Sequence, residues 1–134
     1  MIFSVFANLE KSEIRALANE VIDVIASEQN KIVFNEIYEN LFGSDNVSYM
    51  PESDMYKVCD IAVVLGGDGS TMKVAKNAAI NDKPALGING GRLGFLSAVE
   101  RNELSLLHAV LDGKYTVDER IMLKADVIKN GEVL

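Results

Sequence analysis

Basic residues, cysteines and long apolar runs are all scarce in this sequence of 134 residues. Thirteen Lys and Arg side chains stand against twenty Asp and Glu side chains, and the resulting charge of −7 excludes a broad positive surface for nucleic acid or an anionic membrane. The single cysteine, Cys59, excludes an internal disulfide and a zinc site made mainly of thiolates, which suits a reducing compartment. No apolar run has the length of a secretory signal or a membrane span. We therefore expect a cytoplasmic globular protein that binds neither nucleic acid nor membrane.

Two common nucleotide-binding motifs are also missing. The dinucleotide pattern Gly-x-Gly-x-x-Gly is absent, because Met72 stands where the third glycine after Gly67 and Gly69 would be. The P-loop pattern Gly-x-x-x-x-Gly-Lys-Ser/Thr does not occur either. These absences weigh against a dehydrogenase cofactor domain and a P-loop kinase.

Apolar residues make up 49% of the chain, enough for one ordinary domain with its own core. Strands are expected at 1–6, 32–34, 60–65 and 83–88, and helical segments at 12–27, 36–42, 70–79 and 100–111. Ser12 is the expected cap of the first helix, whose apolar stripe is Ile14, Leu17, Ala18, Val21, Ile22 and Ile25. The continuous apolar run at 60–65 is typical of a strand covered on both faces. The alternation predicts an α/β fold, a Rossmann-like open and mostly parallel sheet flanked by helices.

The most informative stretch is the glycine turn Gly66-Gly-Asp-Gly-Ser70, which directly follows the buried strand at 60–65. Glycines on both sides of Asp68 allow positive φ angles and let a ligand approach the main chain. The helix that follows would direct free N–H groups toward an anion. Strand, turn and helix therefore form a candidate nucleotide site, in which Asp68 is the one side chain able to accept a proton; the alternative is an Asp that only favours a turn.

The sequence changes character after residue 114. Residues 115–128 contain β-branched residues in partial alternation, and Asn130-Gly131 predicts a two-residue hairpin turn followed by three more residues. We expect an α/β domain that carries the Gly-Gly-Asp-Gly turn at 1–114 and the truncated start of a β-rich second domain at 115–134. The alternative is an intact chain with a short terminal hairpin.

The glycine turn, Lys73 and the stretch Leu86-Gly-Ile-Asn-Gly-Gly-Arg-Leu-Gly-Phe-Leu-Ser97 together resemble the N-terminal domain of bacterial-type NAD kinases. Lipid kinases of the diacylglycerol type and 6-phosphofructokinases share a similar turn, but the Asn-Gly-Gly-Arg-Leu-Gly-Phe loop separates this family from them. Ser70 replaces the family's usual Thr and keeps the hydroxyl. The resemblance places the family's own Asn-Glu motif, and the β-domain residues that bind nicotinamide, beyond Leu134.

The resemblance implies phosphorylation of the 2′-hydroxyl of the adenosine ribose of NAD, with ATP or polyphosphate as donor and a divalent metal, Mg²⁺, as cofactor. It also implies a homo-oligomer. Phosphoryl transfer needs alignment, charge neutralisation and an acceptor for the hydroxyl proton, and Asp68 fits the last role. No residue of the chain is assigned to hold the metal. The expected nucleotide-binding residues are Gly66, Gly67, Gly69, Ser70, Lys73, Asn89, Gly90 and Phe95.

Several of these assignments have a plainer alternative. Lys73 resembles the family's NAD-contacting basic residue, but it could be a solvated helix lysine. Phe95 resembles the aromatic residue that packs against adenine, but it could equally belong to the core. Arg92 could reach a phosphate, although a solvated side chain is the safer prediction. For the whole chain, the alternatives are a lipid or sugar kinase that shares the turn, or a noncatalytic nucleotide-binding module.

Overall fold

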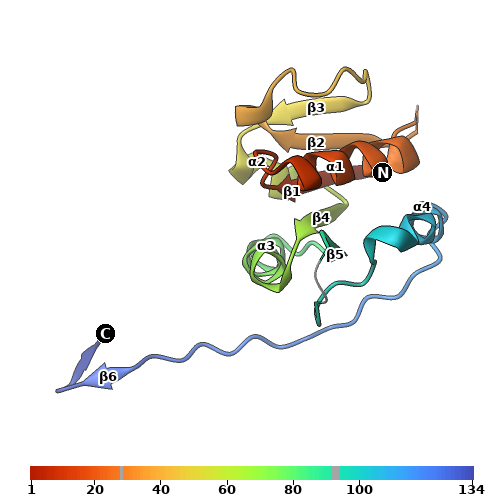
Figure 1. Cartoon of the computed structure of the whole chain (residues 1–134). Coiled ribbons are helices and arrows are strands. Elements are labelled where there is room, and N and C mark those ends of the chain that lie inside the picture. Colours follow the sequence, from red (N-terminus) through yellow and green to blue (C-terminus); the bar gives the residue numbers. More distant parts are fainter. Residues whose placement is uncertain (28, 92–93) are drawn as a thin grey trace.

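The computed structural model describes residues 1–27, 29–91 and 94–134. Its centre is a five-stranded parallel sheet in the order β3-β2-β1-β4-β5 (Figure 1). The strands are β1 (Ile2–Ala7), β2 (Lys31–Asn35), β3 (Val47–Met50), β4 (Ile61–Gly66) and β5 (Ala85–Asn89). The predicted α/β fold with an open parallel sheet is confirmed.

Helices cover both faces of this sheet. They are α1 (Ser12–Ile25), α2 (Glu52–Val58), α3 (Asp68–Ile80) and α4 (Leu107–Leu111), with the short 3₁₀ helices η1 (Glu36–Tyr38) and η2 (Arg101–Leu106). Alternate residues of β4 point to opposite faces: Val63 packs in the core under α1, and Val64 packs in a second core under α2 and α3. This double coverage explains why β4 is apolar throughout. Within the described residues, no helix combines the length and apolarity needed to cross a bilayer.

The structure corrects several predicted boundaries in the first 111 residues. Ser12 is the first residue of α1 rather than its cap; Lys11 precedes the helix without a side-chain cap, and α1 ends at Ile25 rather than residue 27. The predicted helical segment at 36–42 is only the three-residue η1. The predicted helix at 100–111 divides into η2 and α4, and Glu103 within η2 departs from helical angles. The prediction missed β3 and α2, which are short and carry few buried residues.

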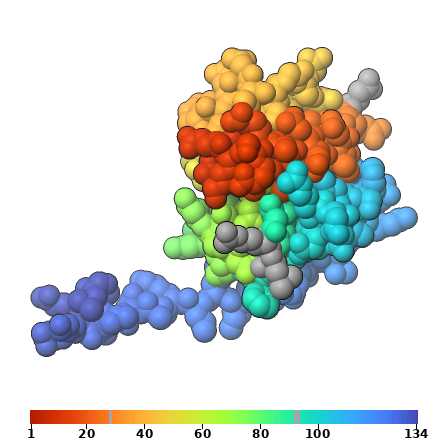
Figure 2. Space-filling model, viewed as in Figure 1, coloured from red at the N-terminus to blue at the C-terminus, as the bar shows by residue number. Residues whose placement is uncertain are grey.

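Beyond Gly113 the chain leaves the body as an extended arm (Figure 2). Residues 115–127 form no strand and are exposed. The hairpin is confirmed: β6 (Ile128–Lys129) pairs with β7 (Glu132–Val133), and Asn130 and Gly131 both have positive φ. The division into two domains stays a prediction.

Candidate functional site

The order of the strands reverses direction at one point of the sheet, between β1 and β4. From β1 the chain continues to β2 on one side, whereas β4 continues to β5 on the other, and β1 and β4 are neighbours. Open α/β sheets bind ligands at this switch point, beyond the carboxyl ends of the strands. The glycine turn follows β4 at this edge of the sheet, and Asn8 follows β1.

The glycine turn passes directly into α3, which begins at Asp68, two residues before the predicted start at Ser70. Gly66, Gly67 and Gly69 all have φ angles outside the left-handed region, so the freedom of these glycines to adopt positive φ is not used here. No left-handed residue is needed because the backbone at Gly67 is extended, with φ −109°, and leads straight into the helix. What the glycines provide is space, since a Cβ atom at Gly67 or Gly69 would meet nothing within 4 Å.

Asp68 is partly exposed, and its carboxylate is held by the loop that follows β5. Its Oδ2 accepts a hydrogen bond from the Phe95 backbone N–H, and its Oδ1 accepts one from Leu96, both at 3.0 Å. These two bonds stabilise the charged form and lower the pKa of Asp68 below its ordinary value. A Cβ atom on Gly94 would lie 2.8 Å from Oδ1, so this glycine lets the loop approach the carboxylate. The sequence analysis included Gly94 only as one position of the stretch from Leu86 to Ser97.

Asn89 and Gly90 connect the ends of β4 and β5. The Asn89 side chain is buried, and its Oδ1 accepts a hydrogen bond from the Gly91 N–H at 3.1 Å. The Gly90 N–H bonds to the carbonyl oxygen of Gly66 at 3.1 Å, and a Cβ atom on Gly90 would lie 2.6 Å from Cδ1 of Ile14. Packing inside the protein therefore accounts for glycine at 90; the ligand contacts predicted for Asn89 and Gly90 stay predictions.

Phe95 is 90% exposed. The alternative that Phe95 belongs to the core is therefore wrong, and the ring is free to receive a planar ligand. Its backbone N–H is the same group that holds Asp68. The prediction for Arg92 falls outside the described residues.

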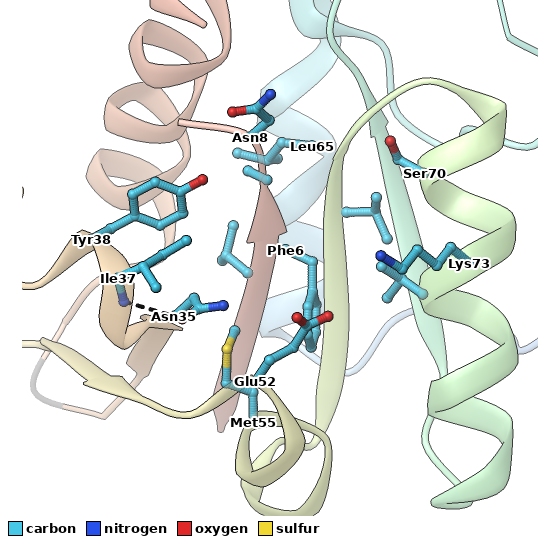
Figure 3. A pocket seen from close by; sticks show the side chains of 14 residues that line it. Phe6, Asn8, Asn35, Ile37, Tyr38, Glu52, Met55, Leu65, Ser70 and Lys73 are labelled. Carbon is cyan, nitrogen blue, oxygen red and sulfur yellow. Dashed lines mark hydrogen bonds between the residues drawn. The ribbon is translucent and has the colours of Figure 1, made fainter. Parts of the chain in front are cut away.

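Ser70 and Lys73 face a different space, a cleft of about 260 Å³ on the side of the sheet covered by α2 and α3 (Figure 3). The cleft begins beside the carboxyl ends of β1 and β4 and extends to η1 and α2. Figure 3 shows the Lys73 ammonium group directed into it. The polar residues that line it are Asn8, Asn35, Tyr38, Glu52, Ser70 and Lys73. The sequence analysis missed the first four; the signal for Asn8 was its place immediately after the first strand.

The predicted site residues thus form two groups around the start of α3. Asp68 and the loop residues at 94–96 make one group, whereas Ser70 and Lys73 line the cleft. In the part of the chain that the structure describes, no three His, Cys, Asp or Glu side chains gather in a cluster able to hold a metal ion.

Comparison with known protein families gives one match across most of the chain. The model of the ATP-NAD kinase N-terminal domain matches residues 3–115. The chain is 31% identical to the NAD kinase of Natranaerobius thermophilus over 124 residues, covering 92% of this chain and 43% of that protein. It is 33% identical to the NAD kinases of Coxiella burnetii and Desulforamulus reducens, covering 84% and 95% of this chain but 38% and 44% of theirs. The chain therefore spans less than half the length of these relatives.

Among solved structures, the chain resembles yeast NADH kinase complexed with NADH. The TM-score is 0.66 at 20% sequence identity, over 85% of this chain and 38% of the yeast chain. At this level of identity the likeness concerns the fold.

Proposed function

We propose that this chain, which belongs to the ATP-NAD kinase N-terminal domain family, forms the part of a NAD kinase that aligns a phosphoryl donor with the 2′-hydroxyl of the adenosine ribose of NAD. The observation that carries this proposal is the family match over 3–115 together with Asp68 at the switch point of the sheet. Because the chain spans 38–44% of the length of the relatives above, the activity is proposed for the protein that contains it.

Asp68 is proposed as the acceptor of the hydroxyl proton. The ribose 2′-oxygen forms a bond to the γ-phosphorus, the bond from that phosphorus to the bridging oxygen breaks, and the hydroxyl proton passes to the Asp68 carboxylate. Two backbone N–H groups occupy only part of the carboxylate, which has about four lone-pair sites, so it can accept a third hydrogen bond from the ribose. A carboxylate with a lowered pKa is a weak base, which suits a reaction in which the proton leaves late.

The remaining predicted residues are proposed to hold the two nucleotides. The backbone N–H groups of Gly67, Asp68, Gly69 and Ser70 lie at the start of α3, where a helix attracts phosphate. Exposed Phe95 is proposed to stack on the adenine of NAD. Lys73 supplies positive charge. The glycine turn after β4 and the loop after β5 are held at a fixed spacing by Gly66, Asn89 and Gly90.

A divalent ion, Mg²⁺, is proposed to arrive with the donor. Mg²⁺ keeps several waters and binds phosphate oxygens readily, so it does not need a protein cage, and the described residues offer no such cluster. Bound to the donor, the ion would neutralise phosphate charge. The expectations of a cytoplasmic homo-oligomer, of polyphosphate as a possible donor and of a β-rich second domain starting at 115 remain part of this proposal.

The test compares acceptors in the natural protein that contains this chain. We expect ATP-dependent phosphorylation of NAD, with no product from diacylglycerol or fructose 6-phosphate under the same conditions. A lipid or sugar product would favour the related kinases that share the turn. Binding of ATP and NAD without any transfer would instead identify a noncatalytic nucleotide-binding module.

A further inference from the structure

The cleft lined by Ser70 and Lys73 lies apart from the Asp68–Phe95 group. No atom of Asp68, Gly94 or Phe95 lines it, although all three lie close to the same helix start. A transfer between two nucleotides needs two binding spaces that meet at the reacting atoms. The exposed Phe95 ring provides one such space, which leaves the cleft for the other substrate.

The cleft has the shape and the lining of a site for a planar ring. Its floor is apolar, made by Phe6 and Val64 from the two central strands and by Met55 and Val74 from the helices. At the rim, Ile37 is 73% exposed, which is unusual for a large apolar side chain, and Tyr38 lies beside it (Figure 3). Small-molecule sites combine an apolar lining with a few placed polar groups.

Two asparagines leave hydrogen-bond donors for a ligand. Asn8 Oδ1 accepts from the Glu10 N–H, and Asn35 Oδ1 accepts from the Ile37 N–H, each at 3.1 Å. Both oxygens are therefore occupied by the backbone, whereas neither NH₂ group has a partner among the described residues. Figure 3 shows the Asn35 amide nitrogen directed into the cleft. Two amide donors fit the ring nitrogens and ribose oxygens of a nucleoside.

Glu52 and Lys73 add one charge of each sign. Figure 3 shows both charged groups directed into the cleft from different helices, and in the described part of the chain neither forms an ion pair. A carboxylate only accepts hydrogen bonds, so Glu52 favours an exocyclic amino group on a base and disfavours a carbonyl oxygen there. Lys73 lies one turn into α3 with Ser70, on the path from the cleft to the helix start, where a triphosphate would run.

We propose that this cleft binds the adenosine of the phosphoryl donor. Glu52 accepts a hydrogen bond from the amino group of the base, Asn8 and Asn35 donate to the nucleoside, and Lys73 contacts the phosphates. The proposal rests on the proposed function above and deepens it: donor and acceptor reach Asp68 from opposite sides of the α3 start. Lys73 then serves the donor rather than NAD.

The first test is base discrimination in the natural protein that contains this chain. Inosine triphosphate carries a carbonyl where ATP carries the amino group, so the wild type should use ATP with a kcat/KM about tenfold higher or more. Glu52→Gln should reduce the preference for ATP over inosine triphosphate, because the glutamine amide can donate a hydrogen bond to the carbonyl of the inosine base. Glu36→Gln, an exposed carboxylate on η1 outside the cleft, is the matched control and should keep the wild-type preference. Equal use of both donors by the wild type would overturn the assignment of Glu52.

The second test separates donor from acceptor binding. Asn35→Asp keeps the oxygen that bonds to Ile37 but removes the NH₂ group, so the KM for ATP should rise about tenfold while the KM for NAD stays within about twofold. Asn19→Asp, on the exposed face of α1, controls for the added charge. An unchanged KM for ATP, or an equal rise for NAD, contradicts the proposal.

Calorimetric titration with ADP distinguishes failure of the cleft assignment from failure of the proposed NAD kinase activity. Weaker ADP binding by Asn35→Asp in a protein that does not phosphorylate NAD would leave the cleft assignment standing and refute the proposed activity. Normal ADP binding by this variant in an active NAD kinase would refute the cleft assignment alone.

Discussion

Asp68 and Phe95 are joined by a hydrogen bond of 3.0 Å between a carboxylate oxygen and a backbone N–H, although 27 positions separate them in the chain. The side chain proposed as the base is thus attached to the residue proposed to hold the adenine of NAD. The position of the proposed base and the proposed binding of NAD therefore depend on the same loop. The absence of a Cβ atom at Gly94 permits this contact.

Gly94→Ala should reduce turnover because the new Cβ would lie 2.8 Å from the Asp68 Oδ1 and force the carboxylate or the loop to move. A displacement of about 1 Å at a reacting group can lower the rate about a hundredfold, and we expect a fall in kcat of that order. Gly43→Ala is the control, because a Cβ there meets nothing within 4 Å. Normal kcat in Gly94→Ala would show that the position of the carboxylate does not limit the reaction.

Phe95→Ala should weaken NAD binding without affecting stability. The ring is 90% exposed, so its removal exposes little new core surface. Stacking of a base on an aromatic ring contributes about 1–3 kcal/mol, and we expect the KM for NAD to rise about tenfold with the KM for ATP unchanged. Ile80→Ala, an exposed apolar residue at the end of α3, provides the control. A lower melting temperature with an unchanged KM would mean that the ring has a structural role.

Gly90→Ala should destabilise the fold by about 1 kcal/mol, since the added Cβ would lie 2.6 Å from the Ile14 Cδ1. The clashing atom is the end of a side chain that can be shortened. Ile14→Val removes it, so the double variant should recover much of the loss measured by urea unfolding. If the double variant is as unstable as the sum of the single variants, the close contact is not the cause.

Asp68 also gives the stability of the protein a specific pH dependence. Its pKa in the folded protein lies below the ordinary value of 3.8, so the ionised carboxylate stabilises the fold above that value, and this contribution is lost as the pH falls through the folded-state pKa. The free energy of unfolding should therefore decline less steeply below about pH 4 in Asp68→Asn than in the wild type. Identical slopes would mean that the two backbone bonds do not hold the carboxylate in solution.

The sequence was most informative where one physical requirement dominated. The run at 60–65 had to be covered on both faces, and the stripe from Ile14 to Ile25 had to face a sheet; both were predicted correctly. Short elements such as β3 and α2 escaped because few of their residues are buried, so no periodic pattern marks them. Residues 115–127 contain β-branched residues yet form no strand, because β-propensity describes side chains that suit a sheet surface and these residues are exposed.

The site was predicted in its parts but not in its arrangement. The glycine turn in the sequence pointed to Asp68. Its contact with the loop at 94–96 could not be predicted, because α3 and β5 lie between them and bring the loop back to Asp68. The cleft was missed because Asn35, Glu52 and Lys73 come from three separate elements and form no motif. The topology that brings them together becomes visible only when β1 and β4 are known to be neighbours.

The most direct measurement of the central claim is the rate at which an Asp68→Asn variant of the natural protein converts NAD to NADP with ATP. Asparagine keeps one oxygen for the loop but cannot accept the hydroxyl proton, so kcat should fall about 10²- to 10⁴-fold while NAD and ATP still bind. Asp23→Asn, on the exposed face of α1, should turn over like the wild type. Near-normal turnover by Asp68→Asn would contradict the account, because the reaction would then proceed without the carboxylate that the glycine turn presents.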